Sequence, residues 1–205
     1  MKLDDKGLLI VISGPSGVGK GTVRKALFER DDHNLVYSIS MTTRKPRVGE
    51  INGKDYFFVS REEFEKRIKE NGFLEYAEFV GNYYGTPIDE VKKQIAAGNE
   101  VVLEIEVQGA LQVREKVKDA VFVFIAPPSL ESLYSRLHNR GTENEEIIKQ
   151  RIEKAKKEID LAYKYDYIVI NDTVDNAADR IMAIIRAEHA KTERTIHKYK
   201  KLLEG

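Results

Sequence analysis

The hydrophobic positions of the chain fall into two patterns that alternate along its length. Four short runs rich in β-branched residues have the length of buried strands, namely residues 8–13, 100–107, 120–126 and 167–171. Between these runs, apolar residues recur at the spacing of helices. Apolar strands that alternate with helices predict a parallel sheet flanked by helices on both faces, so the expected fold class is α/β.

Capping signals predict where several helices begin. Residues 60–63 read SREE, a capping box that places a helix start at Ser60 and leaves Gly72 just beyond the helix end. Pro87 suits the first turn of a second helix. Residues 142–146 read TENEE, which predicts a second capping box and a charged helix through about residue 162.

The C-terminal segment, residues 175–203, is predicted to form one long helix. Its second half is increasingly polar, but Ile196, Tyr199 and Leu203 keep helical spacing. Two interpretations stay open for this stripe. It either packs on the core of its own chain or forms a surface for a partner.

Residues 37–89 differ in character from the strands and helices around them. They are rich in glycine, tyrosine and turn residues, which predicts a small inserted domain. The core is then expected to comprise residues 1–36, 90–126 and 164–205. Residues 127–163 carry several arginines and are expected to form a helical lid that moves over the core.

Residues 14–22 read GPSGVGKGT and lie between a predicted strand and a predicted helix. A glycine-rich turn in this context presents backbone N–H groups to phosphate oxygens, and its lysine adds a full positive charge. A turn that only caps a helix is the alternative, but it leaves the lysine unexplained. The expected ATP-binding residues here are Gly14, Pro15, Ser16, Gly17, Val18, Gly19, Lys20, Gly21 and Thr22.

One position of this loop departs from the usual pattern. Ser or Thr normally follows the lysine directly, whereas here Gly21 does so and the hydroxyl of Thr22 comes one position later. The GKGT ending is similar to the loop of nucleoside monophosphate kinases, where magnesium is held largely through water and nucleotide phosphates. This resemblance implies Mg²⁺ with ATP as the cofactor and no direct protein ligand. Thr22 and Glu104 are candidates for contacts to the ion through water.

The charge composition narrows the range of partners. Lys plus Arg and Asp plus Glu both total 34, so the formal net charge is zero and no basic excess is available for a nucleic-acid polymer. The chain has no cysteine, and its four histidines lack metal-ligand spacing. The longest apolar runs are too short to span a membrane, and the first residues lack a secretory signal, so a cytoplasmic location is expected. The oligomeric state, including a homo-oligomer, is left open.

A second candidate phosphate site lies in the stretch SISMTTRKPRVGEINGKDYFFVS, residues 38–60. It places Arg44, Lys45 and Arg47 within four residues, and guanidinium groups can bind phosphate oxygens in a bidentate manner. Alone, such a cluster is more often a solvated turn. Together with the later segments GFLEYAEFVGNYYGTP, LEIEVQGA, IAPPS, RLHNRGTE and VIND, however, this stretch resembles the guanylate kinase family from about residue 7 to residue 171.

The resemblance implies a phosphate-loop kinase core with a GMP-binding insert and a lid. It also implies ATP-dependent phosphorylation of GMP, and of dGMP, by direct in-line transfer without a covalent intermediate. The residues implied to hold the GMP phosphate are Arg44, Arg47, Tyr56 and Tyr84. Those implied to read guanine are Ser40, Glu75 and Thr86, with Glu106 nearby. Asn171 resembles the family's contact to the adenine of ATP.

The case for Glu75 can also be made from chemistry alone. Guanine presents adjacent N1–H and N2–H₂ donors, and an ionised carboxylate can accept both. Adenine has no donor at N1, and a site built on such hydrogen bonds can reject an analogue that lacks them by about 10⁴- to 10⁵-fold. A glutamate on a surface helix is the alternative interpretation of this position.

Phosphoryl transfer to GMP requires no general base, because the acceptor phosphate, with a second pKa of about 6, is largely ionised at neutral pH. Positioning and cations then carry the catalysis. The catalytic candidates are Lys20, Arg44, Arg140 and Arg151. In the family, the arginines that match Arg140 and Arg151 bridge both phosphate sites. Arg136 is a candidate for ATP binding, with an ordinary i,i+4 surface pair as the alternative.

Glu104 and Glu106 fall near the end of the predicted strand 100–107. Side chains alternate along a strand, so both should point to one face, and ligands bind beyond this edge of an open α/β sheet. The family often has aspartate at these positions. Glu106 is one methylene longer, which leaves open whether it contacts guanine directly or through water.

Two other functions compete with phosphorylation of GMP. A non-catalytic guanylate-kinase-like module would bind protein ligands in the GMP cleft, but such modules typically lack the cations of the phosphate loop and lid. A phosphate-loop kinase for another small substrate is the third hypothesis. Glu75 and Ser40 favour guanine, and a panel of nucleotide acceptors would discriminate.

Overall fold

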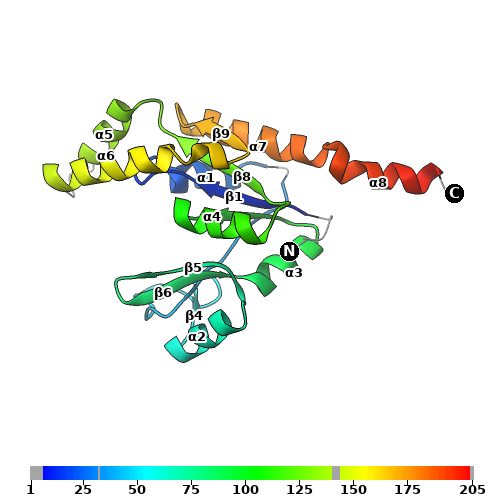
Figure 1. Ribbon diagram of the computed structural model, residues 1–205, viewed down its shortest axis with the longest axis horizontal. Helices are drawn as coiled ribbons and strands as arrows, with labels where there is room; N and C mark the ends of the chain where they lie inside the picture. The colour runs from blue at the N-terminus through cyan, green and yellow to red at the C-terminus, as the bar shows by residue number, and fades with distance from the viewer. Residues whose placement is uncertain (1–6, 32, 140–143, 204–205) are drawn as a thin grey trace. The chain divides into compact units, whose positions relative to one another are not determined.

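The structure is a computed structural model that describes residues 7–31, 33–139 and 144–203 (Figure 1). Its larger sheet has five strands in the order β2 (Leu35–Tyr37), β7 (Glu100–Glu104), β1 (Leu9–Ser13), β8 (Val121–Ala126) and β9 (Tyr167–Ile170). The β2–β7 and β8–β9 pairs are parallel. Every residue of β1 is buried, as an apolar run covered on both faces should be. The predicted α/β class is therefore confirmed.

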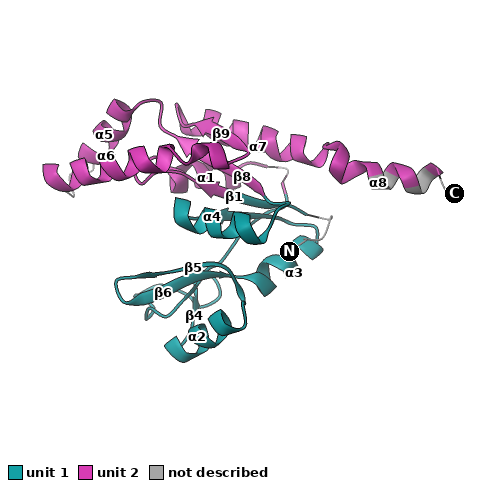
Figure 2. Ribbon diagram, viewed as in Figure 1, with its two compact units in different colours: residues 1–11, 34–120 teal, residues 12–33, 121–205 magenta. Residues whose placement is uncertain are grey.

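Contacts divide the chain into two compact units, residues 1–11 with 34–120 and residues 12–33 with 121–205 (Figure 2). The first unit holds a second sheet, with the order β4 (Phe57–Phe58), β3 (Met41–Thr42), β6 (Asn82–Pro87) and β5 (Phe73–Phe79). Its helices are α2 (Arg61–Lys69), α3 (Ile88–Ala96) and α4 (Val107–Lys116). The division into core, insert and lid stays a prediction.

The helix α2 is built on the small sheet through aromatic side chains. Ser60 is its N-cap, and its hydroxyl accepts the N–H of Glu63 at 3.1 Å, as predicted. Phe64 is fully buried and stacks on Phe73 with the ring centroids 4.3 Å apart. The left-handed residue after the helix is Asn71, with φ of 53°, rather than Gly72. Asparagine tolerates this conformation because its short polar side chain can bond locally.

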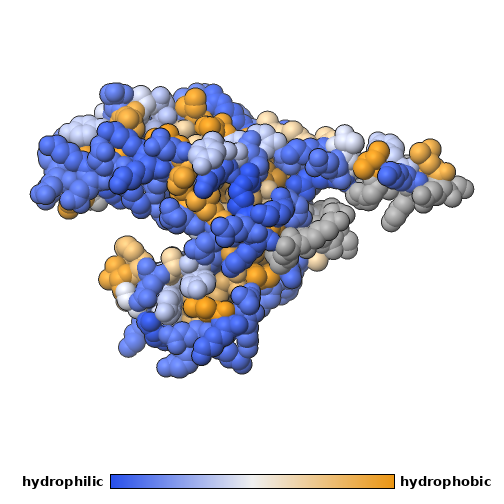
Figure 3. All heavy atoms as spheres, viewed as in Figure 1, coloured by the Kyte–Doolittle hydropathy of each residue, from blue (hydrophilic) through white to orange (hydrophobic). Residues whose placement is uncertain are grey.

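The β5–β6 hairpin turns through two residues that both have positive φ, Val80 at 47° and Gly81 at 72°. Such a turn suits Asn-Gly, whereas a β-branched residue is strained there. Phe79 and Val80 are also highly exposed, and hydrophobic atoms are visible over the end of this hairpin (Figure 3).

We therefore expect Val80→Asn to stabilise the protein. Relief of the strained backbone should contribute about 1 kcal/mol, or about 2–4 °C in Tm, and little burial is lost because the side chain is exposed. Thermal unfolding of the purified variant measures the change. Val80→Ile keeps the branched Cβ and is the matched control, and equal Tm values for the two variants would contradict the strain argument.

The second unit contains α1 (Lys20–Phe28), α5 (Leu130–His138), α6 (Glu145–Ile159), the 3₁₀ helix η1 (Ala162–Lys164), α7 (Val174–His189) and α8 (Thr192–Leu203). The helices α5 and α6 share a small apolar core that includes Leu133, Leu137 and Ile148. The N-cap of α6 is Asn144, whose side chain accepts the N–H of Ile147. The predicted capping box at residues 142–146 was therefore misplaced, and its Thr142 lies outside the described residues.

The prediction of one helix over residues 175–203 was wrong, because the helix stops at His189 and restarts at Thr192. The buried carboxylate of Glu188 lies at the break, where it pairs with Lys191 at 2.7 Å and Arg194 at 3.4 Å. Ile196, Tyr199 and Leu203 on α8 are exposed, which excludes packing of this stripe on the core of its own chain. Among the helices of the described chain, none combines the length and the apolar character needed to cross a membrane.

Candidate active site

The phosphate loop joins β1 to α1 in the second unit, and its shape depends on glycine. Gly19 is the N-cap of α1 with φ of 96°, and a Cβ there would lie only 2.8 Å from Nδ2 of Asn171. The Nζ of Lys20 donates to the carbonyl oxygens of Gly14 at 2.7 Å and Pro15 at 3.3 Å. The lysine thus folds back over its own loop, with its ammonium group bonded to carbonyl oxygens of the loop that precedes α1.

Two arginines from the predicted lid segment contact the same loop. Arg136, on α5, donates to the carbonyl oxygens of Val18 at 2.9 Å and Asn171 at 2.8 Å. Arg151, on α6, donates to the hydroxyl of Ser16 at 3.0 Å. The alternative of an exposed i,i+4 pair for Arg136 is therefore wrong. Both guanidinium groups lie against the backbone or side chains of the phosphate loop.

A cavity of about 460 Å³ opens beside the phosphate loop. The residues that line it come from the loop, α1, α5 and the segment after β9, namely Gly17, Gly19, Thr22, Arg136, Asn139, Asn171, Asp172, Thr173 and Val174. Asn171 is only 3% exposed and donates its Nδ2 to Val18 at 2.8 Å. Its Oδ1 is buried with no hydrogen-bond partner among the described residues. An acceptor left unpaired in this way is costly unless a ligand uses it.

In the first unit, Glu75 lies in a β-bulge of the β5–β6 pair. Phe73 pairs with Pro87 and Tyr76 with Gly85, so Leu74 and Glu75 together oppose the single residue Thr86. The hydroxyl of Thr86 donates to Oε1 of Glu75 at 2.6 Å. Glu75 is 7% exposed, and burial raises the pKa of its carboxyl, against the opposing effects of Thr86 and Lys116.

A cationic and aromatic cluster lies elsewhere in the same unit. The guanidinium of Arg44 is 5.4 Å from the ring centroid of Tyr56, and the ring of Tyr56 is 6.1 Å from that of Tyr84. Arg44 also binds both carboxylate oxygens of Glu50, at 2.8 and 3.0 Å. This hydrogen bonding, together with the backbone N–H of Arg47, lowers the pKa of Glu50 to about 2.

Comparisons with known proteins identify the family of the chain. The family model for guanylate kinase matches residues 6–188. The chain belongs to the guanylate kinase family. It is 62% identical over 205 residues to a guanylate kinase of Onion yellows phytoplasma (strain OY-M), a match that covers all of this chain and 97% of that protein. It is 56% identical over 202 residues to the guanylate kinase of Bacillus subtilis (strain 168), with 98% and 99% of the two chains covered.

A solved structure gives the same result for the fold. The crystal structure of guanylate kinase from Anaplasma phagocytophilum aligns with a TM-score of 0.70 at 39% identity, covering 92% of this chain and 89% of the other. Membership of the guanylate kinase family therefore rests on sequence and on architecture alike.

Three further residues that the guanylate kinase resemblance singled out are Ser40, Arg47 and Arg140. Ser40 directly precedes β3, and its carbonyl oxygen accepts the N–H of Phe57 at 2.9 Å. Arg47 is exposed in the loop before Glu50. Arg140 lies outside the described residues, so its place in the site stays a prediction.

The strand prediction behind Glu104 and Glu106 needs correction. The strand β7 ends at Glu104, and Glu106 is the N-cap of α4. Although the backbone of Glu106 is still extended, with φ of −69° and ψ of 157°, the residue lies beyond the end of β7, so membership of one strand does not place the two carboxylates on one face. Glu104 is half-buried and Glu106 is exposed.

Two partners of the predicted residues could not be inferred from the sequence. Glu50 neutralises Arg44, and its position six residues later in a loop has no periodic signature. Gln112 on α4 bonds to the backbone of Tyr76, next to Glu75, across a sequence separation of 36 residues. Contacts of this range depend on tertiary packing, and a single sequence contains no local signal for them.

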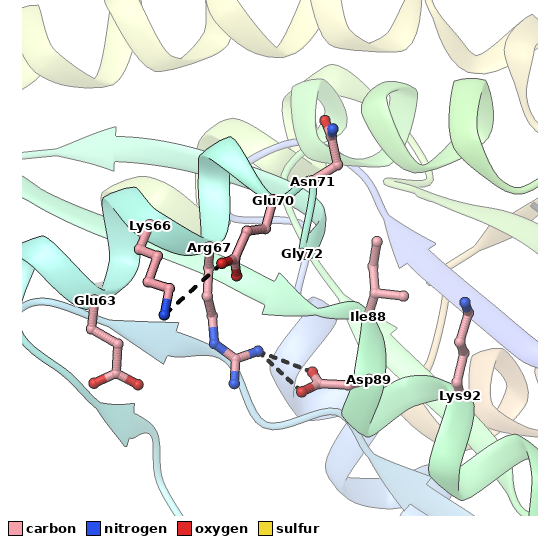
Figure 4. A pocket seen from close by; sticks show the side chains of 9 residues that line it. All are labelled: Glu63, Lys66, Arg67, Glu70, Asn71, Gly72, Ile88, Asp89 and Lys92. Carbon is pink, nitrogen blue, oxygen red and sulfur yellow. Dashed lines mark hydrogen bonds and ion pairs between the residues drawn. The ribbon is translucent and has the colours of Figure 1, made fainter.

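A second cavity, of about 520 Å³, lies in the first unit between α2 and the start of α3 (Figure 4). Its charged side chains are three acidic and three basic residues, Glu63, Glu70, Asp89, Lys66, Arg67 and Lys92. Arg67 binds Asp89 at 3.1 Å and Lys66 approaches Glu70 at 4.0 Å. The charges balance and largely pair with one another, so this cavity offers no basic excess for a nucleotide phosphate.

Proposed function

We propose that the protein catalyses the ATP-dependent phosphorylation of GMP to GDP, and that of dGMP by the same site. Membership of the guanylate kinase family is the observation that carries this activity. The presence of two candidate anion sites, one in each unit, fits a reaction between two nucleotides, since each unit supplies cations and hydrogen-bond donors for one nucleotide. The alternative of a non-catalytic module is disfavoured because Lys20, Arg136 and Arg151 gather at the phosphate loop.

ATP is assigned to the phosphate loop and the cavity beside it. The backbone N–H groups of residues 14–22 and the charge of Lys20 would hold the β- and γ-phosphates. The unpaired Oδ1 of Asn171 is suited to accept a hydrogen bond from the amino group of adenine, which satisfies a buried acceptor. Arg136 helps to order the lining of this cavity, because it donates hydrogen bonds to the carbonyl oxygens of both Val18 and Asn171.

GMP is assigned to the first unit. The ionised Glu75 would accept the N1–H and N2–H₂ of guanine, with Thr86 fixing one carboxylate oxygen. Ser40 and Glu106 are the other candidates for base contacts. Arg44, Arg47, Tyr56 and Tyr84 would hold the phosphate, and a dianion would then compete with Glu50 for the Arg44 guanidinium.

Magnesium fits the donors that the chain presents. Within residues 7–31, 33–139 and 144–203, no three His, Asp or Glu side chains gather as a group that could hold a metal ion. The exposed hydroxyl of Thr22 lines the phosphate-loop cavity, and an oxygen donor beside phosphates and water suits an ion that dehydrates reluctantly. Bound with ATP, Mg²⁺ would neutralise charge on the phosphates. Glu104 is a further candidate for contact through water.

The transfer itself depends on cations and positioning. Lys20 and Arg151 stabilise negative charge on the ATP side, Arg44 does so on the GMP side, and Arg140 is proposed to join them from the lid. An already ionised phosphate oxygen of GMP attacks the γ-phosphorus in line, the bond from that phosphorus to the β,γ-bridging oxygen breaks and ADP leaves, so no side chain has to remove a proton. Closing residues 127–163 over the reactants would exclude water and limit ATP hydrolysis.

A panel of acceptors tests the proposed function. Purified protein with ATP and magnesium is expected to release ADP when offered GMP or dGMP, and not when offered AMP, UMP or TMP, because only guanine presents paired donors to Glu75. A coupled assay for ADP measures the rates, and ATP without an acceptor is the control. Turnover with AMP, UMP or TMP at a rate similar to that with GMP would contradict the proposal.

A further inference from the structure

The bulge that carries Glu75 lies on the edge strand of the small sheet, since β5 ends the order β4-β3-β6-β5. The backbone groups on the outer side of an edge strand have no strand partner, and a bulge weakens the pairing on the inner side as well. The direction of the Glu75 side chain therefore depends on what holds the outer side of β5.

The helix α4 provides that support. The side-chain amide of Gln112 pairs with the backbone of Tyr76 in both directions, since Oε1 accepts the N–H of Tyr76 and Nε2 donates to its carbonyl oxygen, each at 3.2 Å. One turn further along, Nζ of Lys116 donates to the carbonyl oxygen of Phe73 at 2.8 Å. These bonds hold the two residues that flank the bulge, where a neighbouring strand would otherwise bind.

Gly109 belongs to the same stripe of α4, three residues before Gln112. It is buried, and a Cβ at this position would lie 3.0 Å from Oε2 of Glu75 and 3.5 Å from its Cδ. This glycine is in a helix and lacks a positive φ, so the reason for it is the space that the carboxylate occupies. One face of α4 therefore fixes both the backbone around Glu75 and the position of its carboxylate.

We infer that Gly109, Gln112 and Lys116 form a clamp that sets the Glu75 carboxylate for recognition of guanine, with Gln112 as its main positioning residue. The inference rests on the proposed function and adds a determinant of base specificity that does not itself contact the nucleotide. Loss of the clamp lets the bulged segment shift, and Glu75 then fails to meet both guanine donors at once.

Two variants test the clamp in the full-length protein. Gln112→Ala is expected to raise the KM for GMP by about 10-fold, because a small displacement of a recognition group is costly. The kcat and the KM for ATP should stay within about 2-fold, as expected when uniform binding is lost. Gly109→Ala should also raise the KM for GMP, because its Cβ would lie 3.0 Å from Oε2 of Glu75 and would displace the carboxylate. Glu115→Ala, on the exposed face of α4, is the control.

The second readout is the ratio of kcat/KM for GMP to that for inosine monophosphate, whose base lacks the 2-amino group. This ratio reports the contact between Glu75 and the second donor, so it should fall in both clamp variants and stay constant in Glu115→Ala. A general loss of structure would lower both substrates alike. If Gln112→Ala does not fold, Gly109→Ala decides the matter.

The outcomes separate the two proposals. If the unaltered protein forms no GDP from GMP, the proposed function fails and the clamp fails with it. If the unaltered protein uses GMP but the variants keep its KM and its base ratio, the clamp alone is overturned.

Discussion

Replacing Lys20 with methionine is expected to lower kcat by about 10³-fold, equivalent to about 4 kcal/mol of transition-state stabilisation. Methionine is unbranched and only one atom shorter than lysine, but it removes the charge that lies over the loop, 2.7 Å from the carbonyl oxygen of Gly14. Charge on the transferring phosphoryl group then loses its nearest fixed cation. Steady-state kinetics with GMP as the acceptor measures the loss.

Two further variants test whether the loss of kcat is specific to the charge of Lys20. Lys25→Met removes a lysine from the exposed side of the same helix, α1, and should leave kcat unchanged. Thr22→Ala removes the displaced hydroxyl and should cost only about 10-fold, because an ion held by water and phosphates depends less on one protein oxygen. Equal losses for Lys20→Met and Thr22→Ala would contradict the separate roles proposed for charge and hydroxyl.

The parts of this site that the sequence predicted are those specified by local pattern. The phosphate loop follows from one continuous segment, so the turn and the start of α1 could both be expected from residues 14–22, whereas the bond of Lys20 to the carbonyl oxygen of Gly14 was not predicted. The approximate positions of β1, β7, β8 and β9 followed from apolar runs, although Ile168 and Ile170 of β9 are exposed and β2 was not predicted. The end of β7 did not follow from the pattern. Polar and apolar residues continue to alternate over residues 104–107, although the strand ends at Glu104 and α4 begins at Val107.

The helix break near residue 190 was also invisible in the pattern, because no glycine or proline marks it. It coincides with a buried glutamate, Glu188, that pairs with Lys191 in the break, with Arg194 beyond it and with the hydroxyl of Tyr167. The pairing of Arg44 with Glu50 and the clamp behind Glu75 could not be predicted for the same reason. Each depends on which side chains the fold brings together, and residue spacing alone does not determine that.

Glu75→Gln is expected to raise the KM for GMP by at least about 100-fold while the KM for ATP stays nearly constant. The amide keeps the size of the side chain, but one of its two ends becomes a donor that faces the guanine donors. Glu78→Gln, on the exposed part of the same strand, is the matched control and should leave both constants unchanged. Unchanged use of GMP by the Glu75 variant would remove this residue from the guanine site.

The pKa of Glu75 allows this effect to be separated from a loss of stability. Burial raises the pKa of the folded carboxyl above that of the unfolded chain, so the folded protein binds a proton more tightly and the ionised form costs folding free energy at neutral pH. Glu75→Gln should therefore unfold at an equal or higher temperature at pH 7, even as GMP affinity falls. As the pH drops towards the raised pKa, the unaltered protein should lose affinity for GMP because Glu75 becomes protonated. The Glu75→Gln variant has no carboxyl group at this position, so its affinity for GMP should lack this part of the pH dependence. Parallel pH profiles of the KM for GMP in the two proteins would contradict the assignment of an ionised Glu75 to guanine.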